Sequence, residues 1–192
     1  GYFCWGLFHM IGAKKKYGSV QAATNTWRDY MVFSMGFGYP LGVDLPGEKR
    51  GMIPNAAYYD KNYRGSWNGL TIISISIGQG EVTATPLQIA NLGATIANRG
   101  YYITPHVVKE VEDEPLDTLY TTKHYTKVSR EHYQTVVEGM RSAVLGGTCR
   151  SANIPGIEVC GKTGTAQNRG KDHSAFMGFA PMNDPKIAVE SM

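Results

Sequence analysis

The sequence predicts a mixed α/β fold in which helices pack on an antiparallel sheet. Apolar residues recur at helical spacing through most of the chain, whereas the C-terminal part holds strand-like runs at residues 157–167, 174–180 and 186–190. The sequence PMNDP between the last two runs favours a turn, and hence an antiparallel hairpin. A chain of 192 residues is long enough for one sizeable core and requires no second domain.

Helices are expected over residues 2–13, 19–35, 85–99 and 129–145. The third has the strongest start signal, because Thr85 can act as N-cap, Pro86 suits the first helical position and Gln88 completes a capping box. Apolar residues cover nearly its whole circumference, so we expect it at the centre of the core. In the fourth helix Ser129 is the expected cap, and the inward residues are Tyr133, Val136, Val137, Met140 and Val144.

Between the helices the sequence predicts loops and extended segments. The Gly, Pro, Asn and Tyr content of residues 36–68 predicts a long surface loop. The β-branched run LTIISISIG at residues 70–78 predicts a buried strand or extended segment. Gln79, between two glycines, is expected to be a turn residue that fixes the central helix. Residues 101–111 are expected to be extended, and residues 112–117 to form an acidic turn.

Composition argues against several classes of function. The net charge is +3, from 19 basic and 16 acidic residues, and the one basic run is at residues 14–16, so we expect no nucleic-acid partner. Cys4, Cys149 and Cys160 have neither C-x-x-C spacing nor paired histidines nearby, so we expect no metal site and no cofactor. No apolar run approaches the roughly 18 residues of a membrane-spanning helix, and we expect no signal peptide in residues 1–192.

The segment GIEVCGKTGTAQ, residues 156–167, admits two interpretations. Its spacing fits the phosphate-loop pattern G-x-x-x-x-G-K-[ST]. The context does not, because the preceding RSANIP would make a poor buried strand, two of the four residues inside the loop are β-branched and no helical pattern follows. The alternative is a strand that contains Lys-Thr-Gly, in which alternation places Lys162 on a face that can look into a groove.

As a strand, this segment offers a receptor for a peptide carboxylate. Lys162 supplies a fixed positive charge, and Thr163 and Thr165 supply hydroxyl groups. Gly164 lets another backbone approach closely, and the N–H and C=O groups of an edge strand can pair with an extended ligand. From the triplet alone, an exposed strand that leads into a turn is the simpler interpretation.

Further blocks of sequence favour the carboxylate-binding strand over a simple exposed strand. They are FGYPLGVDLPGE at residues 37–48, SIGQGEVTATPLQIA at 76–90, NRGYYITP at 98–105, and GKTGTA at 161–166 followed by DHS at 172–174 and GFAP at 178–181. In this order they resemble the transpeptidase domain of class B penicillin-binding proteins, most closely the elongation-type penicillin-binding protein 2 group. One departure is Ala175, where many relatives carry tryptophan.

The resemblance implies a penicillin-binding transpeptidase or β-lactamase-like fold and serine acyl transfer through the motifs S-x-x-K, S-x-N and K-[ST]-G. The chain contains no S-x-x-K, and its S-x-N strings at residues 66–68 and 151–153 lie in the wrong place relative to the other blocks. Tyr2-Phe3 resembles the aromatic pair that follows the family's second motif. We therefore expect residues 1–192 to be the C-terminal part of a single transpeptidase domain, truncated at both ends and inactive alone.

By the same resemblance, the complete enzyme cross-links peptidoglycan stem peptides through a serine acyl-enzyme and binds β-lactam antibiotics. Catalytic roles would fall to Lys162 and to Thr165, whose N–H would form part of an oxyanion hole. Substrate binding would fall to Thr163, Gly164, Thr165 and Ala166. His173 would be a supporting hydrogen-bond partner rather than a base.

The resemblance also implies a location and partners. The enzyme would act at the periplasmic face of the inner membrane, with its anchor outside this chain, and could meet cell-elongation membrane proteins through domains absent here. Two alternatives stay open. The chain could belong to a D,D-carboxypeptidase or β-lactam-sensing relative of the same fold, or to a non-catalytic binding module.

Overall fold

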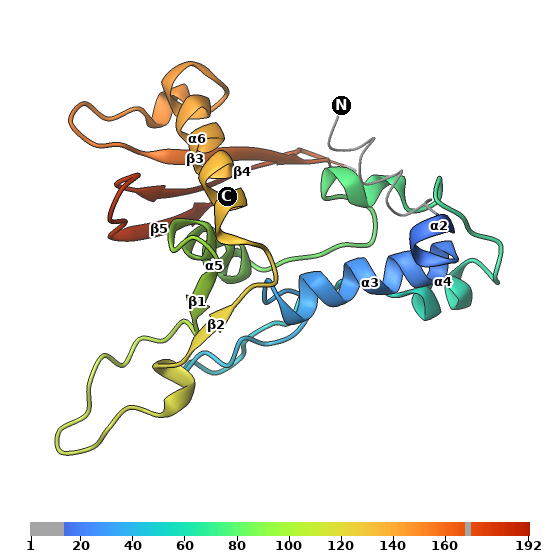
Figure 1. The fold of residues 1–192 in the computed structure, drawn as a ribbon, viewed down its shortest axis with the longest axis horizontal. Coiled ribbons are helices and arrows are strands. Elements are labelled where there is room, and N and C mark those ends of the chain that lie inside the picture. The colour runs from blue at the N-terminus through green and yellow to red at the C-terminus, as the bar shows by residue number, and fades with distance from the viewer. Residues whose placement is uncertain (1–13, 168–169) are drawn as a thin grey trace.

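The computed structural model describes residues 14–167 and 170–192 (Figure 1). The helix predicted over residues 2–13 lies outside the described residues. In chain order the elements, with η marking 3-10 helices, are α2 (Lys14–Tyr17), α3 (Val20–Phe33), α4 (Ala56–Asn62), η1 (Ile73–Ile77), α5 (Pro86–Ala97), β1 (Tyr101–Ile103), η2 (Thr118–Tyr120), β2 (Lys123–Tyr125), α6 (Arg130–Gly146), η3 (Arg150–Ala152), β3 (Cys160–Ala166), β4 (His173–Ala180) and β5 (Ile187–Ser191).

Strands β3, β4 and β5 form an antiparallel sheet in that order, which confirms the predicted strands and their hairpin (Figure 1). Strand β3 begins later than predicted because Pro155 and Gly156 form a turn, closed by a 3.1 Å hydrogen bond from Ile157 N–H to the Ile154 carbonyl. Gly156 has φ 81°, which suits the third position of such a turn. The segment is a strand rather than a phosphate loop, and in the described residues after Lys162 the chain continues in β3 and then forms β4 and β5, with no helix.

One face of the sheet packs on α5 and α6. Cys160 of β3 and Phe179 of β4 lie opposite each other and are 0% and 1% exposed. They belong to a cluster whose other buried members are Ile96, Ala97, Tyr133, Val137 and Met140. The mixed fold with helices on an antiparallel sheet is therefore confirmed, and this cluster anchors the start of β3.

The opposite face of the sheet is organised by Phe176. Its ring lies over Gly161 and Gly178, where an added Cβ would stand 2.5 Å and 2.7 Å from ring carbons. An added Cβ at Gly178 would also stand 2.9 Å from the Cys160 carbonyl oxygen. Both glycines are therefore required by close packing between β3 and β4.

The capping box predicted for α5 is confirmed. Thr85 accepts from the Gln88 backbone N–H at 3.2 Å, and the Gln88 side chain accepts from the Thr85 N–H at 3.0 Å. The buried Gln88 amide also donates to the carbonyls of Tyr39 and Arg50, at 3.0 Å and 2.9 Å. One side chain thus fixes both the start of the helix and the preceding loop.

Helix α6 starts where predicted, although the Ser129 side chain makes no capping hydrogen bond. Tyr133, Val137, Met140 and Val144 are buried as expected. The prediction for Val136 is wrong, since its side chain is 46% exposed. The buried face of α6 is therefore narrower than the spacing of its apolar residues predicted.

The prediction of an unpacked surface loop over residues 36–68 is wrong in part. The segment contains α4, whose N-cap Asn55 accepts from the Tyr58 N–H at 2.9 Å. Tyr59 on this helix is fully buried and its ring lies 5.0 Å from that of Trp67. These aromatic residues form a second small core with Ala23 of α3.

The strand predicted over residues 70–78 is also wrong, because the segment forms η1. Ile72 and Ile75, three residues apart, are both buried, as expected for one face of a 3-10 helix, while Ile73 and Ile77 are exposed. The Ser76 hydroxyl donates to the Ile73 carbonyl at 2.6 Å and supports the turn. Gly78 ends it in the left-handed conformation, with φ 73°.

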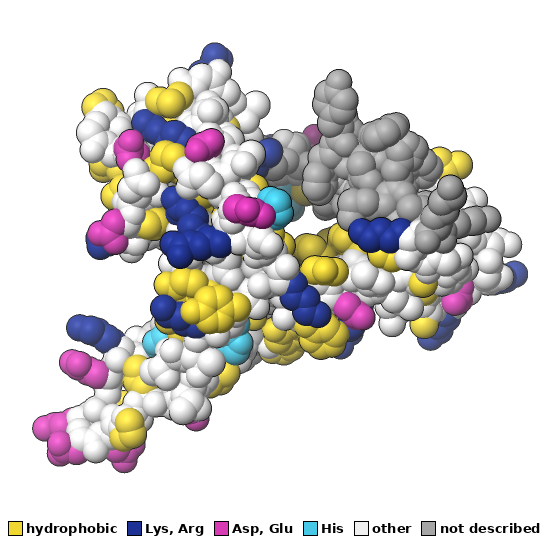
Figure 2. Space-filling view, viewed as in Figure 1, with side chains coloured by type: hydrophobic (Ala, Val, Ile, Leu, Met, Phe, Trp, Pro, Cys, Tyr) yellow, Lys and Arg dark blue, Asp and Glu magenta, His cyan; other side chains and the backbone are white. Residues whose placement is uncertain are grey.

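Strands β1 and β2 form a separate antiparallel hairpin that extends away from the sheet (Figure 1). Of residues 101–111, predicted to be extended, the first three form β1. In the connecting loop Val111 and Glu114 pair across the expected acidic turn. Acidic side chains gather at the tip of this loop (Figure 2).

Close packing at Gly178 predicts a clear effect on stability. Gly178→Ala should lower the free energy of unfolding by about 1–3 kcal/mol, because the new methyl group displaces Phe176 or the Cys160 carbonyl. Gly139→Ala is the matched control, since Gly139 lies in α6 with no atom within 4 Å of an added Cβ, and it should raise stability by about 0.5–1 kcal/mol. Urea denaturation measures both, and equal effects would contradict the packing account.

Candidate functional site

Strand β3 carries the predicted site, and one of its edges is unpaired in the described sheet. Three carbonyls of odd-numbered residues accept hydrogen bonds from side chains, one directly before the strand and two within it. Val159 accepts from Arg141 at 3.0 Å, Thr163 from the Lys162 ammonium, and Thr165 from the Gln79 amide at 3.5 Å. Alternate residues of a strand direct their backbone polar groups to the same edge. The open edge is therefore formed by the odd-numbered residues.

The backbone N–H and C=O groups of the even-numbered residues point to the neighbouring strand β4. Lys162 lies opposite Met177, and Gly164 lies opposite Ala175. In an antiparallel pair the N–H and C=O of one residue point the same way, so the N–H groups of Thr163 and Thr165 point to the open edge. An extended ligand at this edge could accept hydrogen bonds from these two N–H groups. It could also donate to the carbonyls of Thr163 and Thr165, which now accept from Lys162 and Gln79.

The structure places the Lys162 ammonium and the Thr163 hydroxyl on opposite faces of the strand. Lys162 shares its face with Cys160 but lies beyond the covering helices and is exposed. The Thr163 hydroxyl donates to the Thr148 hydroxyl at 3.0 Å, in the loop after α6. Strand alternation separates neighbouring side chains in this way.

The remaining predicted residues line the exposed end of β3. Gly164, Thr165 and Ala166 are all exposed, and an added Cβ at Gly164 would meet no described atom within 4 Å. Thr165 lies opposite Ser174, and Ala166 lies opposite His173. Residues 164–166 of β3 are therefore accessible to solvent both at the open edge of the strand and on its face.

Gln79 is the contact that sequence reasoning missed. We expected only a turn residue, and the structure brings its amide to Thr165, 86 positions along the chain. Gly78 and Gly80 have φ 73° and 76°, and the Gln79 N–H donates to the Ser74 carbonyl at 3.0 Å. The GQG sequence signalled a tight turn but not the strand that it reaches.

Glu81 fixes the end of this turn. Its carboxylate accepts from the hydroxyls of Tyr59 and Tyr63, at 2.9 Å and 2.8 Å. Burial, followed by the bond to Glu81, raises the pKa of Tyr59, and the hydrogen bond to Glu81 raises the pKa of Tyr63. Both tyrosines therefore stay protonated as donors at neutral pH.

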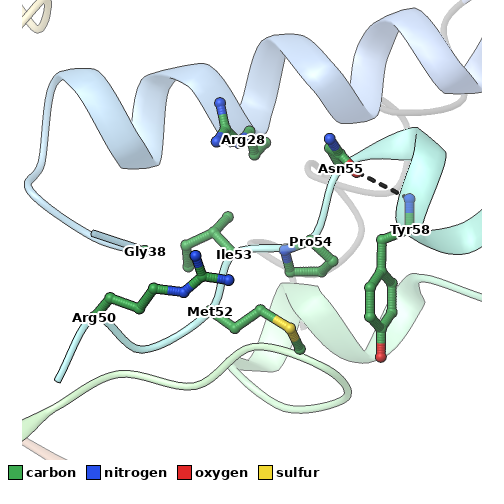
Figure 3. A pocket seen from close by; sticks show the side chains of 8 residues that line it. All are labelled: Arg28, Gly38, Arg50, Met52, Ile53, Pro54, Asn55 and Tyr58. Atoms are coloured by element: carbon green, nitrogen blue, oxygen red, sulfur yellow. Dashed lines mark hydrogen bonds between the residues drawn. The ribbon is translucent and has the colours of Figure 1, made fainter. Parts of the chain in front are cut away.

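Neither of two pockets in the described structure combines a nucleophile with a base for acyl transfer. A pocket of about 200 Å³ lies between α3 and the following loop (Figure 3). Its lining contains no serine, threonine, cysteine or carboxylate and consists of Arg28, Gly38, Arg50, Met52, Ile53, Pro54, Asn55 and Tyr58. A pocket of about 340 Å³ brings Ser151, part of an S-x-N string, near Thr163, but its lining contains no lysine, histidine or carboxylate to act as base.

In the other S-x-N string, Trp67 donates to Asp60 at 2.6 Å within the second core. Among residues 14–167 and 170–192, no group of His, Cys, Asp and Glu side chains could hold a metal ion. The site therefore consists of the edge of β3 and the Gln79 turn.

Comparison with known proteins identifies the family. The profile of the penicillin-binding protein transpeptidase domain matches residues 10–192. The chain belongs to this family. It is 35% identical over 173 residues to the peptidoglycan D,D-transpeptidase MrdA of Acinetobacter baumannii and 33% identical over 178 residues to that of Haemophilus influenzae. Each match covers 80% of this chain, and the chain spans 26% and 27% of those relatives.

Solved penicillin-binding proteins share the fold. PBP2 of Pseudomonas aeruginosa, in complex with WCK 5153, matches with a TM-score of 0.72 and 28% identity, over 97% of this chain and 40% of that one. PBP2 of Helicobacter pylori, in complex with MreC, matches with a TM-score of 0.74 and 27% identity, over 98% and 33%. The chain thus shares both the sequence family and the fold of penicillin-binding protein transpeptidase domains. No helix in its described part has the length and hydrophobicity to cross a bilayer.

Burial at the start of β3 predicts low thiol reactivity. Cys149 and Cys160 are 1% and 0% exposed, and burial raises the pKa of the Cys160 thiol. Since the thiolate is the reactive form, iodoacetamide at pH 8 should label both at least about a hundredfold more slowly in buffer than in urea. Peptide mapping by mass spectrometry measures each site separately. Rapid labelling of Cys160 in the native protein would contradict its position under α5 and α6.

Proposed function

We propose that this chain is part of the transpeptidase domain of a peptidoglycan D,D-transpeptidase, with its nucleophilic serine encoded before Gly1. The observation that carries the proposal is the open edge of β3, where Thr163 and Thr165 present their N–H groups beside the Lys162 ammonium. Edge strands bind extended peptides through main-chain hydrogen bonds. The relatives named D,D-transpeptidases support the same activity.

The proposed roles follow from these positions. Lys162 provides positive potential for the ligand carboxylate and for the reacting serine. Thr163 and Thr165 bind the carboxylate, and the Thr165 N–H stabilises the oxyanion together with the serine N–H. Because the Thr163 hydroxyl now bonds Thr148, it must turn away from that partner to meet a ligand. Gly164 and Ala166 leave room for the peptide backbone.

The reaction would proceed in two acyl transfers. The serine hydroxyl adds to the carbonyl of the penultimate D-alanine, and its proton passes through a base to the departing nitrogen, so that the peptide bond breaks and free D-alanine leaves. An amine of a neighbouring stem then attacks the ester, gives up a proton and forms the new amide, while the serine oxygen regains a proton. A β-lactam would stop at the first stage, because its leaving nitrogen stays tethered to the acyl group.

The cellular setting is part of the proposal. The enzyme would act at the periplasmic face of the inner membrane, held by an anchor outside this chain. The Helicobacter pylori relative was solved with MreC, and we extend to this protein the idea of a membrane-associated elongation partner, bound through regions outside residues 1–192.

Fluorescent penicillin tests the proposal directly. The 192-residue chain should give no labelled band on a denaturing gel, whereas the full gene product should give a band that unlabelled penicillin removes. A band from the chain alone would show that it holds a nucleophile. A full gene product that contains no S-x-x-K and takes no label would favour a binding module.

Lys162→Ala in the full gene product should slow penicillin acylation by about 10- to 100-fold, the effect of losing a hydrogen bond to a charged group. Lys109→Ala, an exposed lysine in the loop between β1 and β2, is the control and should leave the rate unchanged. Equal rates for both variants would contradict the role of Lys162.

Release of free D-alanine from a stem peptide separates the related activities. With an amine acceptor present, a transpeptidase should convert the donor into cross-linked product. A carboxypeptidase would release D-alanine into hydrolysed product with or without the acceptor.

A further inference from the structure

Gln79 reaches the exposed end of β3, along whose open edge a ligand backbone would lie. Its Nε2 is 3.5 Å from the Thr165 carbonyl oxygen, a long hydrogen bond at an exposed position. That carbonyl faces the open edge, on the same side as the Thr165 N–H. A peptide paired with Thr165 would therefore pass beside the Gln79 amide.

The Gln79 amide has unused hydrogen-bonding capacity. A primary amide has two N–H donors and one carbonyl acceptor. Within residues 14–167 and 170–192, the bond to Thr165 is the one made by this side chain, so a second N–H and Oε1 are available to a ligand. A donor and an acceptor on one amide match the C=O and N–H of a peptide bond.

The turn that holds Gln79 is fixed at both ends. Before it, the Gly78 N–H bonds the Ile75 carbonyl at 2.9 Å. After it, Glu81 is held by the hydroxyls of Tyr59 and Tyr63, and Met52 and Thr83 exchange two backbone hydrogen bonds of 2.8 Å and 2.9 Å. A polar group placed on such a support loses little freedom when it binds a ligand.

The order of groups along the edge tells which part of a ligand Gln79 would meet. Lys162 and Thr163 come first, and Thr165 with Gln79 follows. A peptide whose terminal carboxylate lies at Lys162 therefore reaches Gln79 with the amide on the amino side of its D-alanine pair. This assignment rests on the proposed function.

We propose that Gln79 is a specificity-determining residue of this site and binds a backbone amide of the acyl donor beyond the D-alanine pair. It favours donors that carry an acylated amine at that position over shorter ones. Glu81, Tyr59 and Tyr63 act as positioning residues that hold the turn.

Two penicillins separate this role from general damage to the site. Benzylpenicillin carries an acylamino side chain, whereas 6-aminopenicillanic acid has the same ring and carboxylate without that amide. Acylation rate constants are measured for both with the full gene product and its variants. The quantity compared is the rate constant for benzylpenicillin divided by that for 6-aminopenicillanic acid. Gln79→Ala and Gln79→Met should each lower this ratio about fivefold, the effect of losing one neutral hydrogen bond.

The controls distinguish the possible failures. Gln134→Ala, at an exposed position of α6, should leave the ratio unchanged. Tyr63→Phe should lower the ratio less than Gln79→Ala, because Tyr59 still holds Glu81. An unchanged ratio in both Gln79 variants, or an equal loss with both penicillins, overturns the inference while leaving the proposed function intact. A wild-type protein that neither penicillin acylates overturns the proposed function.

Discussion

The pairing of β3 with β4 is the interaction on which the rest of the structure depends. Cys160 and Phe179 lie opposite each other under α5 and α6, and removing a buried ring such as that of Phe179 typically costs about 3–5 kcal/mol. On the other face the Phe176 ring covers Gly161 and Gly178. The start of β3 is therefore held from both faces, and its register is fixed because a shift by one residue would expose Cys160. The end of the strand, from Lys162 onward, then projects beyond the helices in a defined orientation.

A fixed register decides which groups face the open edge. Unpaired edge strands tend to associate with other strands, and their polar groups need partners. Here long side chains supply donors to alternate carbonyls, from Arg141 at Val159 to Gln79 at Thr165. The bond at Val159, directly before β3, joins the chain to α6 and is partly buried, while the bond at Thr165 is long and exposed. The shorter bond holds the start of the strand against α6, and the longer bond leaves the end of the strand available to an extended ligand. A family member that binds peptides by this edge needs both properties.

Local signals explain what the sequence could predict. The capping box of α5 involves residues three positions apart, and the hairpin of β4 and β5 is set by one short turn, so both were predicted correctly. Residues 70–78 were misassigned because a β-branched run of mixed polarity suits a strand and a 3-10 helix alike, and only packing of Ile72 and Ile75 selects the helix. Asn55 was a detectable cap that the loop-like composition concealed. The contact of Gln79 with Thr165 joins segments 86 residues apart, and no local pattern encodes it. The Lys-Thr-Gly strand was recognised from sequence, but the direction of each backbone group required the sheet.

Amide hydrogen exchange measured by NMR on the 192-residue chain tests the open edge most directly. If the odd-numbered residues face solvent, the N–H groups of Thr163 and Thr165 exchange at least about tenfold faster than those of Lys162 and Gly164, which bond to β4. Addition of a peptide that ends in D-alanyl-D-alanine should slow exchange at Thr165 first. Equal protection of all four amides, or fast exchange at Lys162 and Gly164, would contradict a β3 edge that is preformed for an extended peptide.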